Sequence, residues 1–292
     1  MKVLILGGSG MLGHKLWQIL SNDYQVYISL RRSNSMLEAL KGEKMFIRHD
    51  VDALNFDSIT RALASIEPDI VINCIGLIKQ LPIANDPLSS ITINSQLPHR
   101  LSLICKTAKI RLIHISTDCV FSGSKGNYVE DDDSDAKDLY GRSKYLGEVY
   151  YPHTVTLRTS IIGHELGGHL GLVDWFLKQK GSVRGFSKAI FSGFSTLELA
   201  KIIREHVIEN TLLSGLYHVS TQPVSKFHLL EMINKVYKTD TQILPFDGVD
   251  INRSMCGSRF IKATGYSVKD WDTLIYEMYE DYCKNKHLYI KY

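Results

Sequence analysis

Long apolar runs and a strong net charge are both missing from this 292-residue sequence. No window holds the roughly eighteen apolar residues of a membrane-spanning helix, and the short apolar start breaks into glycines without a secretory cleavage site. The net charge of +3 is too small to indicate binding to nucleic acid or to an anionic membrane. We therefore expect a cytoplasmic protein whose partner is a small molecule rather than a nucleic acid or a membrane.

The sequence also lacks the usual patterns of metal ligands. Its cysteines show neither CxxC pairs nor zinc-ligand spacing, which predicts reduced, mostly buried thiols. The acidic run 130–133 resembles a metal loop only in composition, because acids between a strand and a helix are usually solvated. His164 and His169 flank two glycines without HExxH spacing, so we expect no metal site. The cysteines are Cys74, Cys105, Cys119, Cys256 and Cys283.

A glycine-rich turn follows the first apolar run. Lys2 to Leu6 is typical of a strand that a parallel sheet buries on both faces. Gly7, Gly10 and Gly13 follow as GxxGxxG, and helical spacing continues from His14. The three glycines suit a tight turn, a close approach to a pyrophosphate and close helix packing, so the segment predicts a dinucleotide site.

The second strand, Tyr24 to Leu30, ends in Arg31 and Arg32. At this place an acid usually holds the ribose hydroxyls of NAD, whereas an arginine accommodates the extra phosphate of NADP. No acid is present at this strand end, so the sequence favours NADPH. NADH remains the alternative, with the arginines forming only a solvated basic loop.

Strand and helix patterns alternate along the first half of the chain, which predicts a doubly wound parallel α/β sheet. Helices are expected at 56–66 and 88–108, and Asn94 in the second either faces water or bonds backbone groups. After the fourth strand, Cys74, Ile75 and Gly76 lie where the chain would pass under a cofactor. The expected strands are 2–6, 24–30, 44–48, 69–74 and 110–116.

The stretch from 116 to 148 carries three chemically useful side chains. Thr117 follows the fifth strand at its carboxyl end, where ligands bind in open parallel sheets. If residues 138–149 form a helix, Tyr140 and Lys144 share one face, and the ammonium lowers the pKa of the phenol. Such a tyrosine can exchange a proton with a carbonyl or a carbinol. The spacing alone is also compatible with a solvated helix face.

Three runs give this stretch a family resemblance. They are Ser-Thr-Asp-x-Val-Phe-x-Gly at 116–123, Gly-x-Tyr-x-Glu at 126–130, and Tyr-Gly-x-Ser-Lys-x-x-Gly-Glu at 140–148. The sequence thereby resembles the extended short-chain dehydrogenases, and within them the dTDP-4-dehydrorhamnose reductase family. The resemblance implies an NADP-binding Rossmann domain at 1–160, completed by part of 190–220, and a smaller substrate-binding lobe mainly at 161–292.

The resemblance also implies an activity, which is NADPH-dependent reduction of the 4-keto group of a nucleotide-linked 4-keto-6-deoxysugar in polysaccharide biosynthesis. Tyr140 would protonate the alkoxide, Lys144 would lower the pKa of Tyr140 and hold the nicotinamide ribose, and Thr117 would bond the oxygen. A homodimer through residues 88–108 and 137–151 is a further implication. The implied cofactor residues are Gly7, Gly10, Met11, Leu12, Gly13, Arg31, Arg32, Asp50, Val51, Cys74, Ile75, Gly76, Tyr140 and Lys144. The implied substrate residues are Lys79, Asp118, Val120, Trp175 and Arg253.

The sequence departs from the family pattern at two places that bear on the reaction. Asn73 is followed by residues 74–79 in place of the usual Ala-Ala-Tyr-Thr run, which alters a wall facing the sugar. Cys119 stands where related dehydratases have a glutamate, which argues against dehydration. An epimerase with tightly held NAD and a non-catalytic dinucleotide-binding regulatory subunit stay open as alternatives.

Overall fold

The first strand is buried on both faces, and the larger sheet is built around it. The computed structural model describes residues 1–32, 46–168 and 170–289. Along β1 (Lys2–Leu6), successive side chains enter two different hydrophobic clusters, Val3 on one face and Leu4 on the other. This continuous apolar run is what a parallel sheet covered on both sides requires.

In the described residues the large sheet has seven strands in the order β11-β6-β5-β4-β1-β2-β3, and all neighbours are parallel. The order reverses direction at β1, which confirms the predicted doubly wound sheet. The remaining strands are β2 (Gln25–Ser29), β3 (Phe46–Arg48), β4 (Ile70–Asn73), β5 (Arg111–Thr117), β6 (Thr154–Thr159) and β11 (Gly215–His218).

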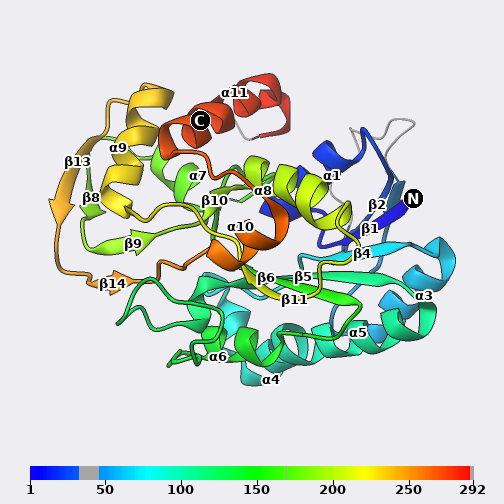
Figure 1. Cartoon of the computed structure of the whole chain (residues 1–292). Coiled ribbons are helices and arrows are strands. Elements are labelled where there is room, and N and C mark those ends of the chain that lie inside the picture. Colours follow the sequence, from blue (N-terminus) through cyan, green and yellow to red (C-terminus); the bar gives the residue numbers. More distant parts are fainter. Residues whose placement is uncertain (33–45, 169, 290–292) are drawn as a thin grey trace.

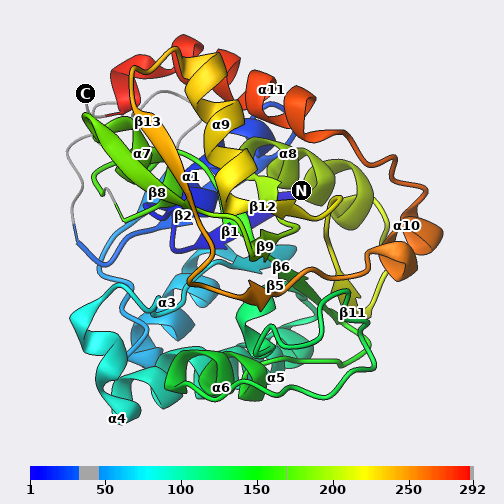
Figure 2. The same ribbon diagram turned by 90° about the vertical axis from the view of Figure 1, so that its left-hand side faces the viewer.

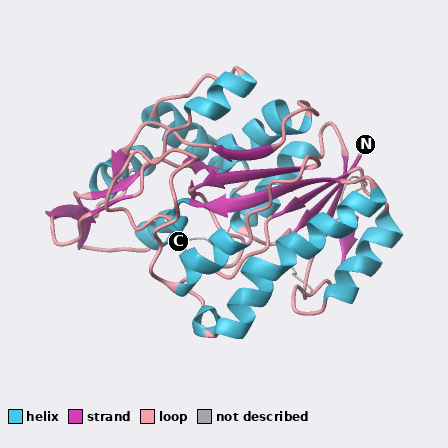
Figure 3. Ribbon diagram, turned by 60° about the horizontal axis from the view of Figure 1, so that its bottom comes forward, coloured by secondary structure: helices cyan, strands magenta, loops and turns pink. Residues whose placement is uncertain are grey.

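Helices cover both faces of this sheet (Figure 1). One layer contains α1 (Met11–Leu20), α8 (Thr196–Ile202), η4 (Ile203–Ile208) and α11 (Trp271–Lys284). The opposite layer contains α3 (Phe56–Ile66), α4 (Pro87–Ser90), η2 (Ile91–Gln96), α5 (Leu97–Ala108) and α6 (Leu139–Leu146). Figure 3 shows the strands fanned between the two layers.

A smaller lobe stands beyond the carboxyl ends of the large sheet (Figure 2). Its largest pairing is between β8 (Ser182–Phe186) and β13 (Gln242–Phe246), and α9 (Lys226–Tyr237) packs on both. The other elements are α7 (Leu172–Leu177), β7 (Ile161–Ile162), β9 (Ala189–Phe191), β10 (Phe194–Ser195), β12 (Val224–Ser225) and β14 (Ile251–Asn252). The predicted boundary between the two domains at residue 160 stays a prediction. β11 follows this residue in the chain but pairs with β6 in the large sheet.

Short helical segments complete the described chain: η1 (Pro82–Asn85), η3 (Asp118–Val120), α10 (Ser258–Thr264) and η5 (Lys286–Leu288). No helix in residues 1–32, 46–168 and 170–289 is long and apolar enough to cross a membrane. The expected strand at 44–48 begins at Phe46 in the described structure, because residues 44 and 45 lie outside the described residues.

Helix α6 ends earlier than the predicted 149, at Leu146. Gly147 leaves the helical conformation as the C-cap, and it packs closely on η2: a β-carbon on Gly147 would stand 1.9 Å from the carbonyl oxygen of Asn94. The helix begins where expected, because the Asp138 carboxylate accepts a hydrogen bond from the Gly141 amide at 2.7 Å and caps the first turn. The cap and the close packing fix the position of the helix that carries Tyr140 and Lys144.

Candidate active site

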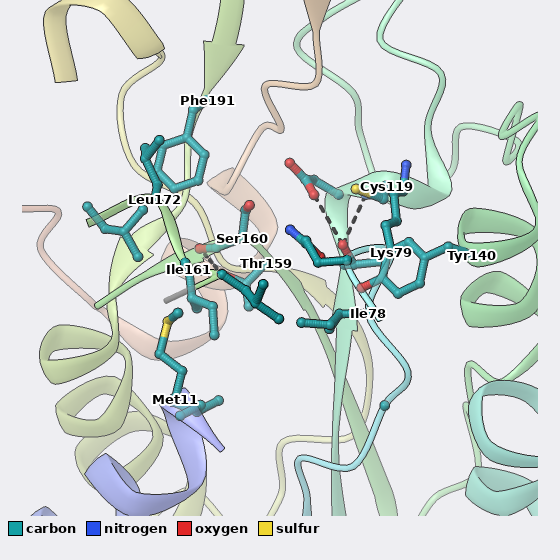
Figure 4. Close-up of a pocket in the computed structure, with 18 of the residues that line it drawn as sticks. Met11, Ile78, Lys79, Cys119, Tyr140, Thr159, Ser160, Ile161, Leu172 and Phe191 are labelled. Carbon is teal, nitrogen blue, oxygen red and sulfur yellow. Dashed lines mark hydrogen bonds between the residues drawn. The ribbon is translucent and has the colours of Figure 1, made fainter. Parts of the chain in front are cut away.

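A cavity of about 600 Å³ opens at the carboxyl ends of the strands. Its walls run from the glycine turn, along the ends of β4 and β5, to the small lobe. Figure 4 shows Tyr140, Lys79 and Cys119 on one wall, with Met11, Ile161, Leu172 and Phe191 on the other. The cavity brings together most of the predicted site residues. They are Gly10, Met11, Leu12, Gly13, Cys74, Ile75, Gly76, Lys79, Thr117, Asp118, Tyr140, Lys144 and Arg253.

The glycine turn has the tight geometry that the sequence predicted. Gly7 has φ +85°, in the left-handed region, and its carbonyl accepts a hydrogen bond from the Gly10 amide at 3.0 Å. A β-carbon on Gly13 would lie 2.2 Å from the Gly7 oxygen, so only glycine lets α1 start this close to the turn. Amide groups at the start of α1 are thereby available to an anion such as a pyrophosphate.

The residues expected at the adenine end lie outside the cavity lining. Arg31 and Arg32 follow β2 and are exposed. After β3, Asp50 adopts φ 59° and the Val51 amide donates to the Leu30 carbonyl at 3.1 Å, so the chain turns inward beside the end of β2. Their predicted contacts with the cofactor stay predictions.

The segment after β4 approaches the catalytic helix closely. A β-carbon on Gly76 would lie 3.9 Å from the Lys144 Nζ atom and 3.5 Å from the Asn94 side-chain oxygen. The buried Asn94 side chain accepts from the Leu77 amide at 2.9 Å and donates to the Ser143 hydroxyl at 3.1 Å. Asn94 therefore forms hydrogen bonds with backbone groups, which is one of the two alternatives that the sequence left open. These bonds connect the segment after β4 to α6.

Thr117, Tyr140 and Lys144 are brought together from β5 and α6. Burial raises the pKa of the Tyr140 phenol, the nearby Cys119 thiol adds to this, and a hydrogen bond with Thr117 partly opposes it. The shift is opposite in direction to the one expected from Lys144. Tyr140 is thus a neutral phenol at neutral pH, which is the form that can donate a proton.

Lys144 is completely enclosed, and its ammonium donates to the Ile115 carbonyl at 2.8 Å. Burial lowers the pKa of Lys144 to about 8, while the Glu148 carboxylate favours the charged form. The ammonium is held below the strand end that carries Thr117. The sequence placed Lys144 on one face with Tyr140, but it gave no indication of the Ile115 contact.

Sequence reasoning missed a buried ionic network behind these residues. The Arg158 guanidinium on β6 donates to both Glu148 oxygens, at 2.8 and 2.7 Å, and both side chains are almost completely buried. The Ser116 hydroxyl donates to Glu148 at 2.6 Å. A signal existed, because an arginine inside a strand of the large sheet needs a buried acid.

The lobe side of the cavity carries cations around one buried acid. Burial raises the pKa of the Asp118 carboxyl, and the charges of Arg253 and Lys226 oppose the shift. Arg253 donates from Nε to the Phe121 carbonyl at 2.8 Å. Lys226, at the start of α9, was not predicted to belong to the site, and nothing in its local sequence distinguishes it from a surface lysine.

Two predicted substrate residues do not line the cavity. Val120 is fully buried and packs in a small cluster with Phe121, Tyr128 and Met255. Trp175 lies on α7 with 38% of its surface exposed. Apolar residues of β8, β9 and β14 form the lobe wall instead, and the sequence analysis missed them: Phe186, Ile190, Phe191 and Ile251.

The histidines considered as metal ligands are placed only in part. His164 is buried and bonds the Asp174 carboxylate at 2.7 Å and the Tyr237 hydroxyl at 2.8 Å, while His169 lies outside the described residues. Among the residues that the structure describes, no three His, Cys, Asp or Glu side chains are grouped as metal ligands. His164 therefore belongs to a structural network.

A doubly wound sheet, a glycine turn and a Thr-Tyr-Lys group at the strand ends define a dinucleotide-binding protein of the extended short-chain dehydrogenase type. The chain belongs to the RmlD substrate binding domain family, whose sequence profile matches residues 1–254.

Individual relatives agree with this assignment. A dTDP-4-dehydrorhamnose reductase of Streptomyces griseus is 27% identical over 146 residues, covering 50% of this chain and 43% of the relative. The spore coat polysaccharide biosynthesis protein SpsK of Bacillus subtilis is 29% identical over 234 residues, covering 78% and 76%. The chain thus spans less than half the length of the first of these relatives and about three quarters of the second.

Solved structures share the fold. The crystal structure of dTDP-4-dehydrorhamnose reductase from Bacillus anthracis in complex with NADP superposes with a TM-score of 0.78 at 21% identity, covering 96% of this chain and 99% of that one. The likeness confirms the predicted Rossmann-type fold over the chain.

Proposed function

We propose that the protein reduces the 4-keto group of a nucleotide-linked 4-keto-6-deoxysugar with NADPH, in the biosynthesis of a polysaccharide. The single observation that carries this proposal is the grouping of Thr117, at the end of β5, with Tyr140 and Lys144, one helical turn apart on α6, in the wall of the cavity. The resemblance of the 116–148 runs to reductases, and the names of the relatives, support the same reaction.

The glycine turn and Gly76 fit a dinucleotide, because a side chain at Gly13 would close the space beside the first turn of α1. Gly10 to Gly13 would hold the pyrophosphate, Cys74 to Gly76 would lie against the nicotinamide half, and Arg31 and Arg32 would bind the 2′-phosphate. The bound cofactor supplies the hydride. NADP in the Bacillus anthracis relative supports NADPH as the cofactor, with NADH as the alternative.

Residues of the protein supply the proton that the reduction consumes. Tyr140 donates its hydroxyl proton to the oxygen that becomes negative during reduction, and Thr117 donates a hydrogen bond to the same oxygen. Lys144 holds positive charge behind them, anchored to the Ile115 carbonyl. These roles require Tyr140 to be protonated before the reaction, as its raised pKa ensures.

The cations of the lobe side suit an anionic substrate. In the described part of the chain, the Lys226 ammonium and the terminal nitrogens of Arg253 make no hydrogen bond or ion pair with protein groups. A diphosphate would satisfy both groups, and the sugar would then extend toward Tyr140 and Lys79. This arrangement makes the smaller lobe the substrate-binding part of the protein, as the sequence analysis expected for 161–292.

A homodimer through the helices near 88–108 and 137–151 is part of the proposal. Leu88, Leu103 and Leu146 are 75%, 62% and 60% exposed there, and Tyr150 is 52% exposed. Light scattering of the purified protein tests it, with a Leu103→Glu, Leu146→Glu double variant as the monomeric comparison.

The dehydratase alternative is weakened at Cys119. Burial raises the pKa of this thiol to about 12, so Cys119 cannot act as the carboxylic acid that elimination would use. An epimerase would instead carry stoichiometric NAD after purification and would consume no NADPH.

The decisive experiment follows NADPH oxidation against dTDP-, UDP- and GDP-linked 4-keto-6-deoxysugars, with the product configuration determined by NMR. We expect turnover with at least one substrate and a loss of about a hundredfold or more in the Tyr140→Phe variant. Turnover by Tyr140→Phe at the wild-type rate would remove Tyr140 as proton donor. No turnover with any ketosugar, together with dinucleotide binding, would favour a regulatory subunit.

A further inference from the structure

A second lysine reaches Tyr140 from outside its own helix. The Lys79 ammonium lies 5.6 Å from the centroid of the Tyr140 ring (Figure 4). It also forms an ion pair with the Asp138 carboxylate at 2.6 Å. Lys79 belongs to the segment after β4, where this sequence departs from the family pattern. The expected contact of Lys79 with the substrate stays a prediction; the structure places Lys79 in the cavity wall, against the proposed proton donor.

We propose that Lys79 acts through Tyr140, stabilising the phenolate that forms when Tyr140 gives up its proton, and that Asp138 opposes it. The inference rests on the proposed function, in which the O–H bond of Tyr140 breaks, the proton goes to the alkoxide oxygen, and the electron pair stays on the phenol oxygen. That oxygen becomes anionic, so a cation beside the ring favours the step.

The charges around Tyr140 explain why a second cation matters. Asp118 and Cys119, which follow β5, raise the pKa of Tyr140 and so disfavour the phenolate. Asp138, which precedes α6, has the same effect. Thr117 favours the phenolate through its hydrogen bond. Lys144, on the same helix, directs its ammonium to the Ile115 carbonyl. The Lys79 ammonium, by contrast, lies over the Tyr140 ring, 5.6 Å from its centroid.

The geometry predicts opposite effects for the two partners of the ion pair. Lys79→Met removes the cation and makes Tyr140 a weaker acid. Asp138→Asn removes the anion, leaves the ammonium beside the ring and makes Tyr140 a stronger acid. Asparagine also caps helices, so α6 keeps its first turn in the second variant. If the pair only fixed the segment after β4, both variants would shift Tyr140 in the same direction.

Lys125 offers a matched control. Its ammonium lies 5.7 Å from the Tyr128 ring centroid and pairs with Asp132 at 2.6 Å, so Lys125→Met deletes the same kind of contact away from the cavity. Lys79→Arg is the conservative variant, because it keeps the charge beside the ring.

The first experiment needs no turnover. A difluorotyrosine, whose phenol titrates several pH units lower than tyrosine, replaces Tyr140, and its ionisation is followed by fluorine NMR in the full chain. We expect the midpoint to rise in Lys79→Met, fall in Asp138→Asn and stay at the wild-type value in Lys125→Met and Lys79→Arg. An unchanged midpoint in Lys79→Met, or shifts of the same sign in the two pair variants, would overturn the proposal.

The second experiment measures kcat and KM with a ketosugar that the wild type reduces. Lys79→Met should lower kcat about three- to tenfold with little change in KM, and Lys79→Arg should recover most of the loss. A rise in KM at constant kcat would overturn the proposal, since it would make Lys79 a substrate contact. Absence of wild-type turnover would count against the proposed function alone, because the fluorine titration still decides the role of Lys79.

Discussion

The Arg158 guanidinium and the Glu148 carboxylate form a doubly hydrogen-bonded ion pair in which neither side chain exposes more than 2% of its surface. Glu148 lies two residues beyond the end of α6, and its carboxylate also accepts from Ser116, which precedes Thr117. The pair thus connects β5, β6 and the segment that follows α6. It holds the relative positions of the groups proposed for catalysis.

Breaking the Arg158–Glu148 pair should lower the free energy of unfolding by a large part of its value. Arg158→Met leaves the Glu148 charge buried without its main partner, so we expect the free energy of unfolding to fall by about 3–5 kcal/mol. Chemical denaturation measures the loss. The control is Arg204→Met, which breaks pairs with the exposed Asp23 and Glu205 and should cost about 1 kcal/mol or less. Equal losses in the free energy of unfolding of the two variants would show that the burial of the Arg158–Glu148 pair does not increase its contribution to stability.

Adding one methyl group at the glycine turn should abolish dinucleotide binding. In Gly13→Ala the new β-carbon would meet the Gly7 oxygen at 2.2 Å, so α1 must move away from the turn. Titration with NADPH, monitored by cofactor fluorescence, should detect at least a tenfold weaker affinity, roughly 1.4 kcal/mol. Gly167→Ala, whose β-carbon would meet no atom within 4 Å, should bind as the wild type does.

The buried lysine gives stability a defined pH dependence. Because the folded-state pKa of Lys144 is about 8 and its ordinary value is 10.5, the unfolded chain binds more protons between these values. The free-energy cost of burying the Lys144 charge is therefore largest below pH 8. This cost disappears as the pH rises to 10.5. Lys144→Met should unfold with a higher free energy than the wild type at pH 7, by roughly 1–3 kcal/mol.

The comparison of Lys144→Met with the wild type should be repeated at several pH values by urea denaturation. The stability difference should shrink steadily between pH 8 and 10.5, because the wild type recovers the cost of the buried charge. A difference that is constant over this range would show that the pKa of Lys144 is the same in the folded and the unfolded chain, and would contradict the lowered value.

Cofactor choice should depend on the arginines after β2. In Arg31→Ala and Arg32→Ala, the loss of a charge-assisted contact with the 2′-phosphate should weaken NADPH binding about tenfold or more. NADH affinity is the internal control, because NADH lacks this phosphate. Equal weakening of both cofactors, or of neither, would remove the proposed phosphate role.

Local patterns sufficed to predict the parts of the site that are close in sequence. The β1 strand, its glycine turn and α1 are contiguous, and Tyr140 and Lys144 are related by helical spacing. By contrast, β8 and β13 pair across a long separation in the chain, with Ser182 opposite Gln242, and neither strand shows a strict alternation of exposed and buried residues. Such strands form through tertiary pairing, which no local pattern contains.

The positions of the charged residues around the cavity could not be predicted for the same reason. Lys79 and Asp138 form an ordinary charged pair only once the segment after β4 folds over α6. Lys226 faces the cavity because α9 packs on β8 and β13. The pKa of Tyr140 likewise depends on how completely the cavity wall encloses the phenol, which spacing to Lys144 cannot reveal.

The π-helical turn η2 interrupts the long helix between α4 and α5, and its last bond runs from the Leu97 amide to the Thr92 carbonyl, five residues back. A π turn accommodates one residue more than an α turn, so the two flanking helices are out of phase by about 100°. Deleting a single residue between 91 and 96 would restore an uninterrupted α-helix and rotate Asn94 away from Leu77 and Ser143. The contacts of Asn94 with Leu77 and Ser143 therefore depend on the number of residues in a helix that supplies none of the proposed Thr-Tyr-Lys group.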